Sequence, residues 1–246
     1  MTDVEHINPY DGDKRGKKEQ VAAMFDAIAP AYDFMNRAMT FGLDRLWLRA
    51  LVKAVQNRAP SEVTDLATGT GDVACAIAAS IPGTTVRGLD ISEGMLAKAR
   101  TRAKERGLDS RVSFACADCL ATGLPDSCTD AITVAYGVRN FADIAAGYRE
   151  MYRILRPGGQ LAVLELSKPV NILVKPLYAV YTKWLIPAAG SLISGDSRAY
   201  SYLPESIAAA PAGNDMTALM TQAGFSGARF RRLSFGVCTL YQAFKE

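Results

Sequence analysis

Histidine is nearly absent from this chain: among 246 residues only His6 is a histidine, and it lies in a polar stretch near the N-terminus. Histidine is the usual general base near neutral pH and a frequent metal ligand. Its scarcity argues against histidine acid–base catalysis, and we expect no metal site. Proton transfer would have to use a carboxylate, a tyrosine or water.

Cysteine is also sparse, with five residues scattered through the chain, and no stretch has the pattern of a signal peptide. An odd number of scattered cysteines predicts reduced thiols and a cytoplasmic protein rather than a disulfide framework. Cys116 and Cys119 form a C-x-x-C pair, but the second pair that a zinc site needs is missing. No thioredoxin-like pattern surrounds them either.

A large excess of charge is missing as well, because 28 Lys and Arg against 25 Asp and Glu leave a net charge of +3. This argues against a nucleic-acid partner. The length and the 49% hydrophobic content predict one globular domain with a full core. The most apolar segment, Val170–Ile193, is too interrupted to cross a membrane, because it contains Lys175, Pro176, Lys183 and Pro187.

What the chain does contain is a glycine-rich turn, Asp65-Leu66-Ala67-Thr68-Gly69-Thr70-Gly71-Asp72. The pattern predicts a buried strand over Val63–Ala67 and a helix over Asp72–Ser80. Gly69 and Gly71 would let the backbone turn and approach a ligand without a Cβ in the way. The turn therefore indicates a nucleotide-type cofactor site, although a plain tight turn is the alternative.

Asp90 closes the next predicted strand, Thr85–Asp90. An acid at this strand end can accept two hydrogen bonds from the hydroxyls of a ribose. The structural alternative is that Asp90 only caps the following helix. Gly69, Gly71 and Ala74 also satisfy the looser G-x-G-x-x-G/A pattern of nicotinamide and flavin enzymes, so two cofactor classes remain open at this point.

The order of the remaining elements separates these classes. Strands are expected over 111–116, 130–135 and 160–165 and helices over 92–106, 141–155 and 215–223, and this alternation predicts a parallel sheet covered on both faces. Strands Ala228–Leu233 and Val237–Phe244, joined by Ser234–Gly236, predict a hairpin. An antiparallel edge argues for a class I methyltransferase fold, a Rossmann-like, mostly parallel seven-stranded sheet with a C-terminal antiparallel hairpin.

The N-terminal part is predicted as an extension outside this sheet. We expect a flexible arm over residues 1–20, then helices over Val21–Ala29 and Tyr32–Val55 separated by Pro30. Residues 21–246 form a single domain in this interpretation. Its cofactor-binding core spans 61–165, and 166–214 is an insertion over the substrate.

Asp118 favours S-adenosylmethionine as the cofactor. An acid just past the third predicted strand can reach the amino group of an adenine, although a simple loop acid is the alternative. Ile91 and Met95 could pack on the adenine, and a core role for Met95 is equally open.

Several segments then resemble one family, the C-methyltransferases of menaquinone and ubiquinone biosynthesis. The resemblance runs from about Val21 to the C-terminus. Its carriers are Tyr32-Asp33-Phe34-Met35-Asn36, Arg45-Leu46-Trp47, Gly69-Thr70-Gly71-Asp72, Tyr136-Gly137-Val138-Arg139-Asn140, Arg156-Pro157-Gly158-Gly159, Glu165-Leu166-Ser167-Lys168-Pro169 and Tyr200-Ser201-Tyr202-Leu203-Pro204-Glu205-Ser206-Ile207. The chain departs from the family at Thr68, Asp44 and Tyr241, which leaves the fine shape of the substrate pocket open.

The resemblance implies S-adenosylmethionine bound through Thr70, Asp90, Asp118 and Cys119, and a polyprenylated quinol as methyl acceptor. We add Asp65, Gly69, Gly71, Ile91 and Ala135 to the expected cofactor site, and Tyr32, Asn36, Tyr200 and Tyr202 to the substrate site. Demethylmenaquinol is the favoured acceptor. A benzoquinol of ubiquinone biosynthesis, another small apolar molecule, or a non-catalytic binding protein are the alternatives.

Methylation of a ring carbon requires a quinol that has lost a hydroxyl proton, and a phenol titrates near pH 10. Arg139, after the fourth predicted strand, could stabilise the phenolate, with Asn140 and Tyr136 beside it. Asp33 and Asp196 are the candidate bases. The alternatives are a surface salt bridge for Arg139, a helix cap for Asp33, and packing for the tyrosines.

The segment Val170–Ile193 completes the expectations. Leu173, Leu177, Tyr181, Trp184 and Leu185 would share one helical face, with lysines able to extend to water. Such a helix could cover a prenyl tail, touch the membrane interface as a peripheral contact, or pack in the core. A homodimer is left open.

Overall fold

The structure is a computed structural model that describes residues 2–10, 12–172, 174, 176, 178 and 197–246. Its centre is a seven-stranded sheet with the strand order β3-β2-β1-β4-β5-β7-β6. The first five strands are parallel, and β7 pairs antiparallel with both β5 and β6. The strands are β1 (Glu62–Leu66), β2 (Thr85–Asp90), β3 (Val112–Cys116), β4 (Thr129–Ala135), β5 (Leu155–Leu166), β6 (Ser226–Leu233) and β7 (Cys238–Phe244).

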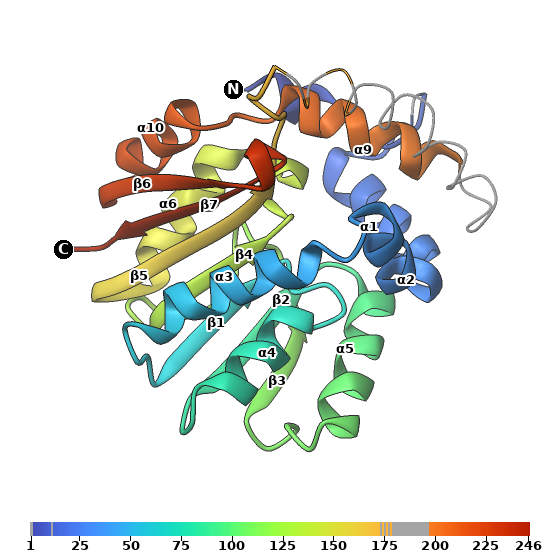
Figure 1. The fold of residues 1–246 in the computed structure, drawn as a ribbon. Helices are drawn as coiled ribbons and strands as arrows, with labels where there is room; N and C mark the ends of the chain where they lie inside the picture. The colour runs from blue at the N-terminus through green and yellow to red at the C-terminus, as the bar shows by residue number, and fades with distance from the viewer. Residues whose placement is uncertain (1, 11, 173, 175, 177, 179–196) are drawn as a thin grey trace.

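Helices cover both faces of this sheet, with α3, α4 and α5 on one face and α6 and α10 on the other (Figure 1). The longer helices are α1 (Lys17–Ile28), α2 (Tyr32–Met39), α3 (Asp44–Gln56), α4 (Asp72–Ser80), α5 (Glu93–Glu105), α6 (Ile144–Ile154), α9 (Ser197–Ala209) and α10 (Asn214–Gln222). Short 3-10 turns are η1 (Asp3–His6), η2 (Ala29–Ala31), η3 (Val138–Asn140) and η5 (Ser234–Gly236). The predicted fold class, including the C-terminal hairpin, is confirmed.

Two hydrophobic cores follow from the alternation of side chains along the buried strands. In β5, Leu161 and Val163 belong to the core under α6 and α10, whereas Ala162 and Leu164 belong to the core under α3 and α4. Because both faces are covered, the central strands are largely buried, and the buried polar residues Asp65 of β1 and Thr133 of β4 bond to each other. This rigid sheet carries the loops that form the site.

The N-terminal helices differ from the sequence prediction in one respect. The helix expected over Tyr32–Val55 is interrupted, since α2 ends at Met39 and α3 begins at Asp44. Phe41 and Gly42 between them have φ angles of 51° and 76°, a left-handed conformation that no helix continues. The prediction missed this break because Gly42 lies inside an otherwise periodic apolar pattern.

The first twenty residues were expected as a flexible arm, but the structure packs them against the domain. Val4 is fully buried, and the buried Glu5 accepts a hydrogen bond from the Ile144 N–H at the start of α6. Lys17 is buried as well, and its Nζ donates to the carbonyl oxygens of Val4 and Arg139. Burial lowers the pKa of Lys17 to about 8. Two charges of this segment, Glu5 and Lys17, are therefore buried and bind backbone groups, whereas other charged residues such as Arg15 and Glu19 remain exposed as expected.

Within the described residues, no helix has both the length and the apolar character that a membrane crossing demands.

Candidate cofactor and substrate site

The site lies at the carboxyl ends of the parallel strands, where β1 sits between β2 and β4 and the chain order reverses. The turn after β1 runs into the N-terminus of α4, whose N-cap is Gly71 at φ 75°. A Cβ on Gly71 would lie 2.9 Å from the Cβ of Ala99, so this position needs glycine both for its φ angle and for room. Gly69, at φ 54°, would meet no atom within 4 Å, because its open side faces the site.

Asp65 holds this turn from below. Its carboxylate is buried and accepts hydrogen bonds of 2.6 Å from the hydroxyls of Thr68, in the turn, and Thr133, on β4. Burial raises the pKa of Asp65 to about 6, because the charged form loses its water. Asp65 was predicted to contact the cofactor. Its hydrogen bonds instead anchor the turn, although it also lines the large cavity.

Asp90 lies beside the turn, as its position at the end of β2 predicted. One carboxylate oxygen accepts the Gly69 N–H at 2.7 Å and the other accepts the Ser92 N–H at 2.9 Å. The cap of α5 is Ser92, whose hydroxyl accepts the Met95 N–H. Asp90 is therefore not the helix cap, and burial raises its pKa. A carboxylate has about four acceptor positions, so two backbone donors leave capacity for a ligand.

A small cavity of about 100 Å³ opens beside Asp90. Its walls include Ile91, Met95 and Asp118, which were expected near an adenine, and Cys119, which the resemblance implied in the cofactor site. The Asp118 carboxylate already has partners, because it accepts the Leu120 N–H and forms an ion pair with Lys18 on α1 at 2.9 Å. Lys18 therefore brings α1 to the edge of the small cavity.

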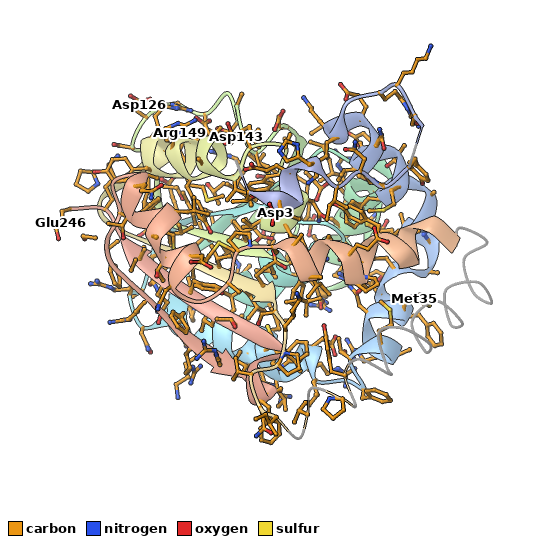
Figure 2. The ribbon with its side chains drawn as sticks, turned by 90° about the horizontal axis from the view of Figure 1, so that it is seen from above. Asp3, Met35, Asp126, Asp143, Arg149 and Glu246 are labelled. Atoms are coloured by element: carbon orange, nitrogen blue, oxygen red, sulfur yellow. The ribbon has the colours of Figure 1, made fainter. Side chains whose placement is uncertain are left out.

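A second cavity of about 670 Å³ adjoins the first. The two share seven wall residues: Phe25, Tyr32, Ala67, Gly69, Ala135, Tyr136 and Asn140. The larger one continues between α2, α3 and α9, and many of its walls are apolar. Figure 2 shows Met35 of α2 close to α9, where Met24, Met35 and Tyr202 form a small buried cluster behind this cavity.

Arg139 lies in the wall of the large cavity and is only 6% exposed. Its Nη1 binds Glu165 Oε1 at 2.6 Å, and its backbone N–H donates to the other oxygen of the same carboxylate at 3.2 Å. Nη1 also donates to the Tyr136 carbonyl, while Nε is buried without a hydrogen-bond partner among the described residues. The ion pair is thus in the interior rather than on the surface. The guanidinium is oriented by Glu165 through Nη1.

The other residues expected beside Arg139 also reach the cavities. Asn140 accepts a hydrogen bond of 3.1 Å from the hydroxyl of Tyr202, and its Nδ2 donates to the Tyr136 carbonyl. Tyr32 and Tyr136 line both cavities, and burial raises the pKa of both phenols. Asn36 lines the large cavity. The structure therefore brings these predicted catalytic and substrate residues together.

Asp33, a predicted base, is held in a network. Its Oδ1 accepts the Thr70 hydroxyl at 2.7 Å, and its Oδ2 forms an ion pair with Arg102 of α5. Arg102 also donates to the carbonyl and the hydroxyl of Thr70, at 2.6 and 2.8 Å. Thr70, expected at the cofactor, thus joins the glycine turn to both α2 and α5.

Some predictions fall outside the described residues. Asp196 and most of the Val170–Ile193 segment lie there, and so does the side chain of Tyr200, so these expectations stay predictions. Of the three departures from the family pattern, Thr68 and Asp44 line the large cavity. Tyr241 is instead buried in the core, where its hydroxyl accepts the Gly213 N–H at 2.9 Å.

Comparison with known proteins now separates the interpretations. A model of the ubiE/COQ5 methyltransferase family matches residues 13–245. The chain belongs to the ubiE/COQ5 methyltransferase family. A demethylmenaquinone methyltransferase of Bacteroides fragilis is 45% identical over 241 residues, 98% of each chain. Another, of Porphyromonas gingivalis, is 42% identical over the full length of both.

A solved structure agrees with this assignment at the level of the fold. An S-adenosylmethionine-dependent methyltransferase of Thermotoga maritima has a TM-score of 0.61 at 19% identity, and the match covers 91% of this chain and 99% of that one. The family recognised in the sequence motifs is confirmed, and the protein is a methyltransferase of the S-adenosylmethionine-dependent class.

Two residues of this methyltransferase site were not among the predicted ones. Arg102 lies on an ordinary charged helix and gave no signal in the sequence. Glu165 ends a buried strand within the motif Glu165-Leu166-Ser167-Lys168-Pro169, and a carboxylate at that position needs a buried cation as partner. Pairing Glu165 with Arg139 would have been possible from this argument.

The first testable prediction concerns Asp65. Because its folded pKa of about 6 lies above the unfolded value near 3.9, its contribution to stability is complete below pH 4 and is lost as the pH rises through 6. The loss amounts to about 3 kcal/mol. Asparagine does not titrate, so the Asp65→Asn variant should not show this pH-dependent loss. The unfolding free energy of the variant minus that of the parent should therefore increase from pH 4 to pH 7. Urea unfolding at several pH values measures this.

The control is Asp109→Asn, which changes an exposed carboxylate between α5 and β3. Parallel stability curves for Asp65→Asn and the parent would contradict the assignment of a raised pKa to Asp65.

Proposed function

We propose that this protein transfers the methyl group of S-adenosylmethionine to a ring carbon of a polyprenylated quinol, and that the quinol is demethylmenaquinol. The observation that carries the proposal is the pair of adjoining cavities. The small one contains a buried carboxylate beside a glycine turn, and the large, apolar one contains the oriented guanidinium of Arg139. The names of the relatives at 42–45% identity support the ring identity.

The residues of the small cavity fit the nucleoside part of this cofactor. Asp90 is buried, accepts two backbone N–H groups and retains acceptor positions for the ribose hydroxyls. Gly69 leaves open space next to it. Ile91 and Met95 offer apolar contact for a base, and Asp118 lies at the rim. When bound, S-adenosylmethionine supplies an electrophilic methyl group on a sulfonium that leaves readily.

The residues of the large cavity fit a quinol ring. A phenol loses its proton only near pH 10 in water, so the protein must stabilise the phenolate for the ring carbon to react at neutral pH. Arg139 is placed for this, since it lines the large cavity and its guanidinium is fixed by Glu165. Asn140 and Tyr202 form a hydrogen-bonded pair beside it and orient the ring.

Positioning supplies most of the remaining rate. Tyr32, Ala135, Tyr136 and Asn140 line both cavities, so a ring held against them faces the smaller cavity directly. Holding two reactants at near-attack geometry in a site that excludes water contributes roughly 7–11 kcal/mol. Positioning does not accept protons, so the hydroxyl proton and the ring hydrogen that the methyl group replaces would leave to a carboxylate or to water.

The mouth of the large cavity suits a prenyl tail. Phe41 lines this cavity and is 75% exposed. Two more exposed apolar side chains lie close by in the sequence: Ile172 is two residues before the lining residue Val174, and Phe235 is two residues before the lining residue Val237. Exposed apolar side chains around an apolar cavity favour a long hydrocarbon substrate. Peripheral contact with a bilayer at this rim is part of the proposal, because the tail would have to enter from lipid.

The second prediction tests the reaction. The purified protein with S-adenosylmethionine should methylate demethylmenaquinol, detected by mass, faster than a demethylated benzoquinol. Lengthening the tail from one prenyl unit should lower KM more than it raises kcat, since tail contacts are equal in ground and transition states. Preference for the benzoquinol would select that alternative ring, and methylation of neither quinol would overturn the proposal.

A third prediction concerns the ribose contact. Asp90→Ala should remove two charge-assisted hydrogen bonds and weaken S-adenosylmethionine binding by about 2–4 kcal/mol. Calorimetry measures this, with Glu93→Ala as the control, because Glu93 is an exposed acid in the first turn of α5 that pairs only with Arg100 in the described structure. An affinity within threefold of the parent, with the fold intact, would exclude the ribose role.

The fourth prediction concerns the phenolate. Arg139→Leu should lower the methyl-transfer rate by about a hundredfold or more, the scale of losing one preorganised donor, while cofactor affinity changes little. Because Arg139→Leu leaves Glu165 buried without a cation, the double variant Arg139→Met/Glu165→Gln is measured as well. A near-parent rate in single turnover for either variant would reject the role of Arg139.

A further inference from the structure

Helices α1 and α2 form a small unit that lies over the cofactor cavity. Phe25 of α1 and Tyr32 of α2 line both cavities. The apolar side chains of this unit gather in a cluster of their own around Met24, Met35 and Tyr202, and the two large cores contain no residue of α1 or α2 among those described. An element with its own small core has a lower cost of local opening than one built into the main core.

Polar contacts tie this unit to the rest of the domain at the start of α5. Asp26 of α1 accepts hydrogen bonds from the Ser92 hydroxyl at 2.5 Å and the Gly94 N–H at 2.9 Å. Lys98 donates to the Pro30 carbonyl at 2.9 Å. These contacts are at or near the surface, so they can exchange for water when the unit moves.

The contact nearest the cofactor turn is different in kind. Arg102 is only 17% exposed and extends from α5, and its guanidinium joins that helix to three other elements. It donates twice to Thr70 in the turn, and it pairs with Asp33 on α2 and with Asp72 at the start of α4. The Thr70 hydroxyl also donates a hydrogen bond to Asp33, so Arg102, Thr70 and Asp33 all contact one another. If α2 moved away from the turn, Arg102 and Thr70 would stay in contact with each other, but both would lose their contact with Asp33.

We propose that Arg102, through Asp33 and Thr70, is a positioning residue that latches α2 over the bound cofactor and sets how fast the spent cofactor leaves. The proposal rests on the proposed function for the identity of the ligand. It gives Asp33 the role of latch partner rather than base, because its carboxylate is held by the Thr70 hydroxyl and the Arg102 guanidinium. Tyr32, the residue before Asp33, lines both cavities, so the latch also fixes a wall that they share.

The test measures release of S-adenosylhomocysteine by stopped-flow displacement. Arg102→Gln should speed release by about 10–100-fold, the effect expected from losing hydrogen bonds to a charged group, with a smaller change in the association rate. The matched control is Arg100→Gln, which removes an arginine two residues away on α5 whose described partner is the exposed Glu93. It should release the ligand at the parent rate.

Salt gives a readout that a purely structural role would not move. Because Asp33 is 43% exposed, the latch is partly screened, and release from the parent should accelerate between low salt and 1 M NaCl. Release from Arg102→Gln should depend on salt much less. In the ligand-free protein, amide exchange in α1 and α2 should also be faster in Arg102→Gln than in Arg100→Gln.

Asp33→Asn separates a latch from a base. If Asp33 is a latch partner, release from Asp33→Asn should be as fast as release from Arg102→Gln, and combining the two substitutions should not speed release further. The single-turnover rate of Asp33→Asn at saturating cofactor should stay within about fivefold of the parent rate. Loss of a general base would instead lower that rate by about a hundredfold or more.

The outcomes are distinct. Tight ligand binding with unchanged release and exchange in Arg102→Gln would overturn the latch while leaving the proposed function intact. A base-like loss in Asp33→Asn would also overturn it. No binding of S-adenosylhomocysteine to the parent would instead count against the proposed function.

Discussion

The buried carboxylate of Asp65 is the point on which the site depends. It lies opposite Thr133 in the register of β1 and β4 and accepts hydroxyl bonds from Thr133 and from Thr68 of the turn. Burying a carboxylate is costly unless its oxygens are bonded, so the two hydroxyls keep both the strand pair and the turn in place. With the turn fixed, the Gly69 N–H points at Asp90, and the two cavities open on either side of one backbone segment.

The parts that the sequence predicted well are those with local patterns. The strand before Gly69, the acid at the end of β2 and the C-terminal hairpin follow from spacing that neighbouring residues set by themselves. The parts it missed depend on partners far apart in the chain. Arg102 meets Asp33 across 69 positions, and Ile144 meets Glu5 across 139, so no window of sequence contains either pair. Whether a charged residue is solvated or bound is decided by such distant partners.

Arg139 and Glu165 illustrate why a buried ion pair belongs in an apolar cavity. An unpaired guanidinium would pay a large desolvation cost, and Glu165 offsets it through one side-chain and one backbone hydrogen bond. The guanidinium of arginine has several donors, and here Nη1 binds both Glu165 and the Tyr136 carbonyl, which fixes the plane of the group. A lysine would bind the carboxylate as a single point and leave no fixed donor. The main effect of the ion pair is therefore to orient the Arg139 guanidinium, because the two charges largely cancel.

The site contains two ion pairs, Arg139–Glu165 and Arg102–Asp33, which differ in their exposure to water. This difference suits them to different roles. Arg139 and Glu165 are enclosed, so their geometry is held rigidly and is little affected by salt or by motion of the surface. Arg102 and Asp33 lie nearer to water, where an ion pair is weak enough to open and re-form. A site that must hold one reactant still and release another needs both kinds. Because Tyr32 is the first residue of α2 and lines both cavities, opening at the Arg102–Asp33 network loosens the wall that the two reactants share, while Arg139 stays in place.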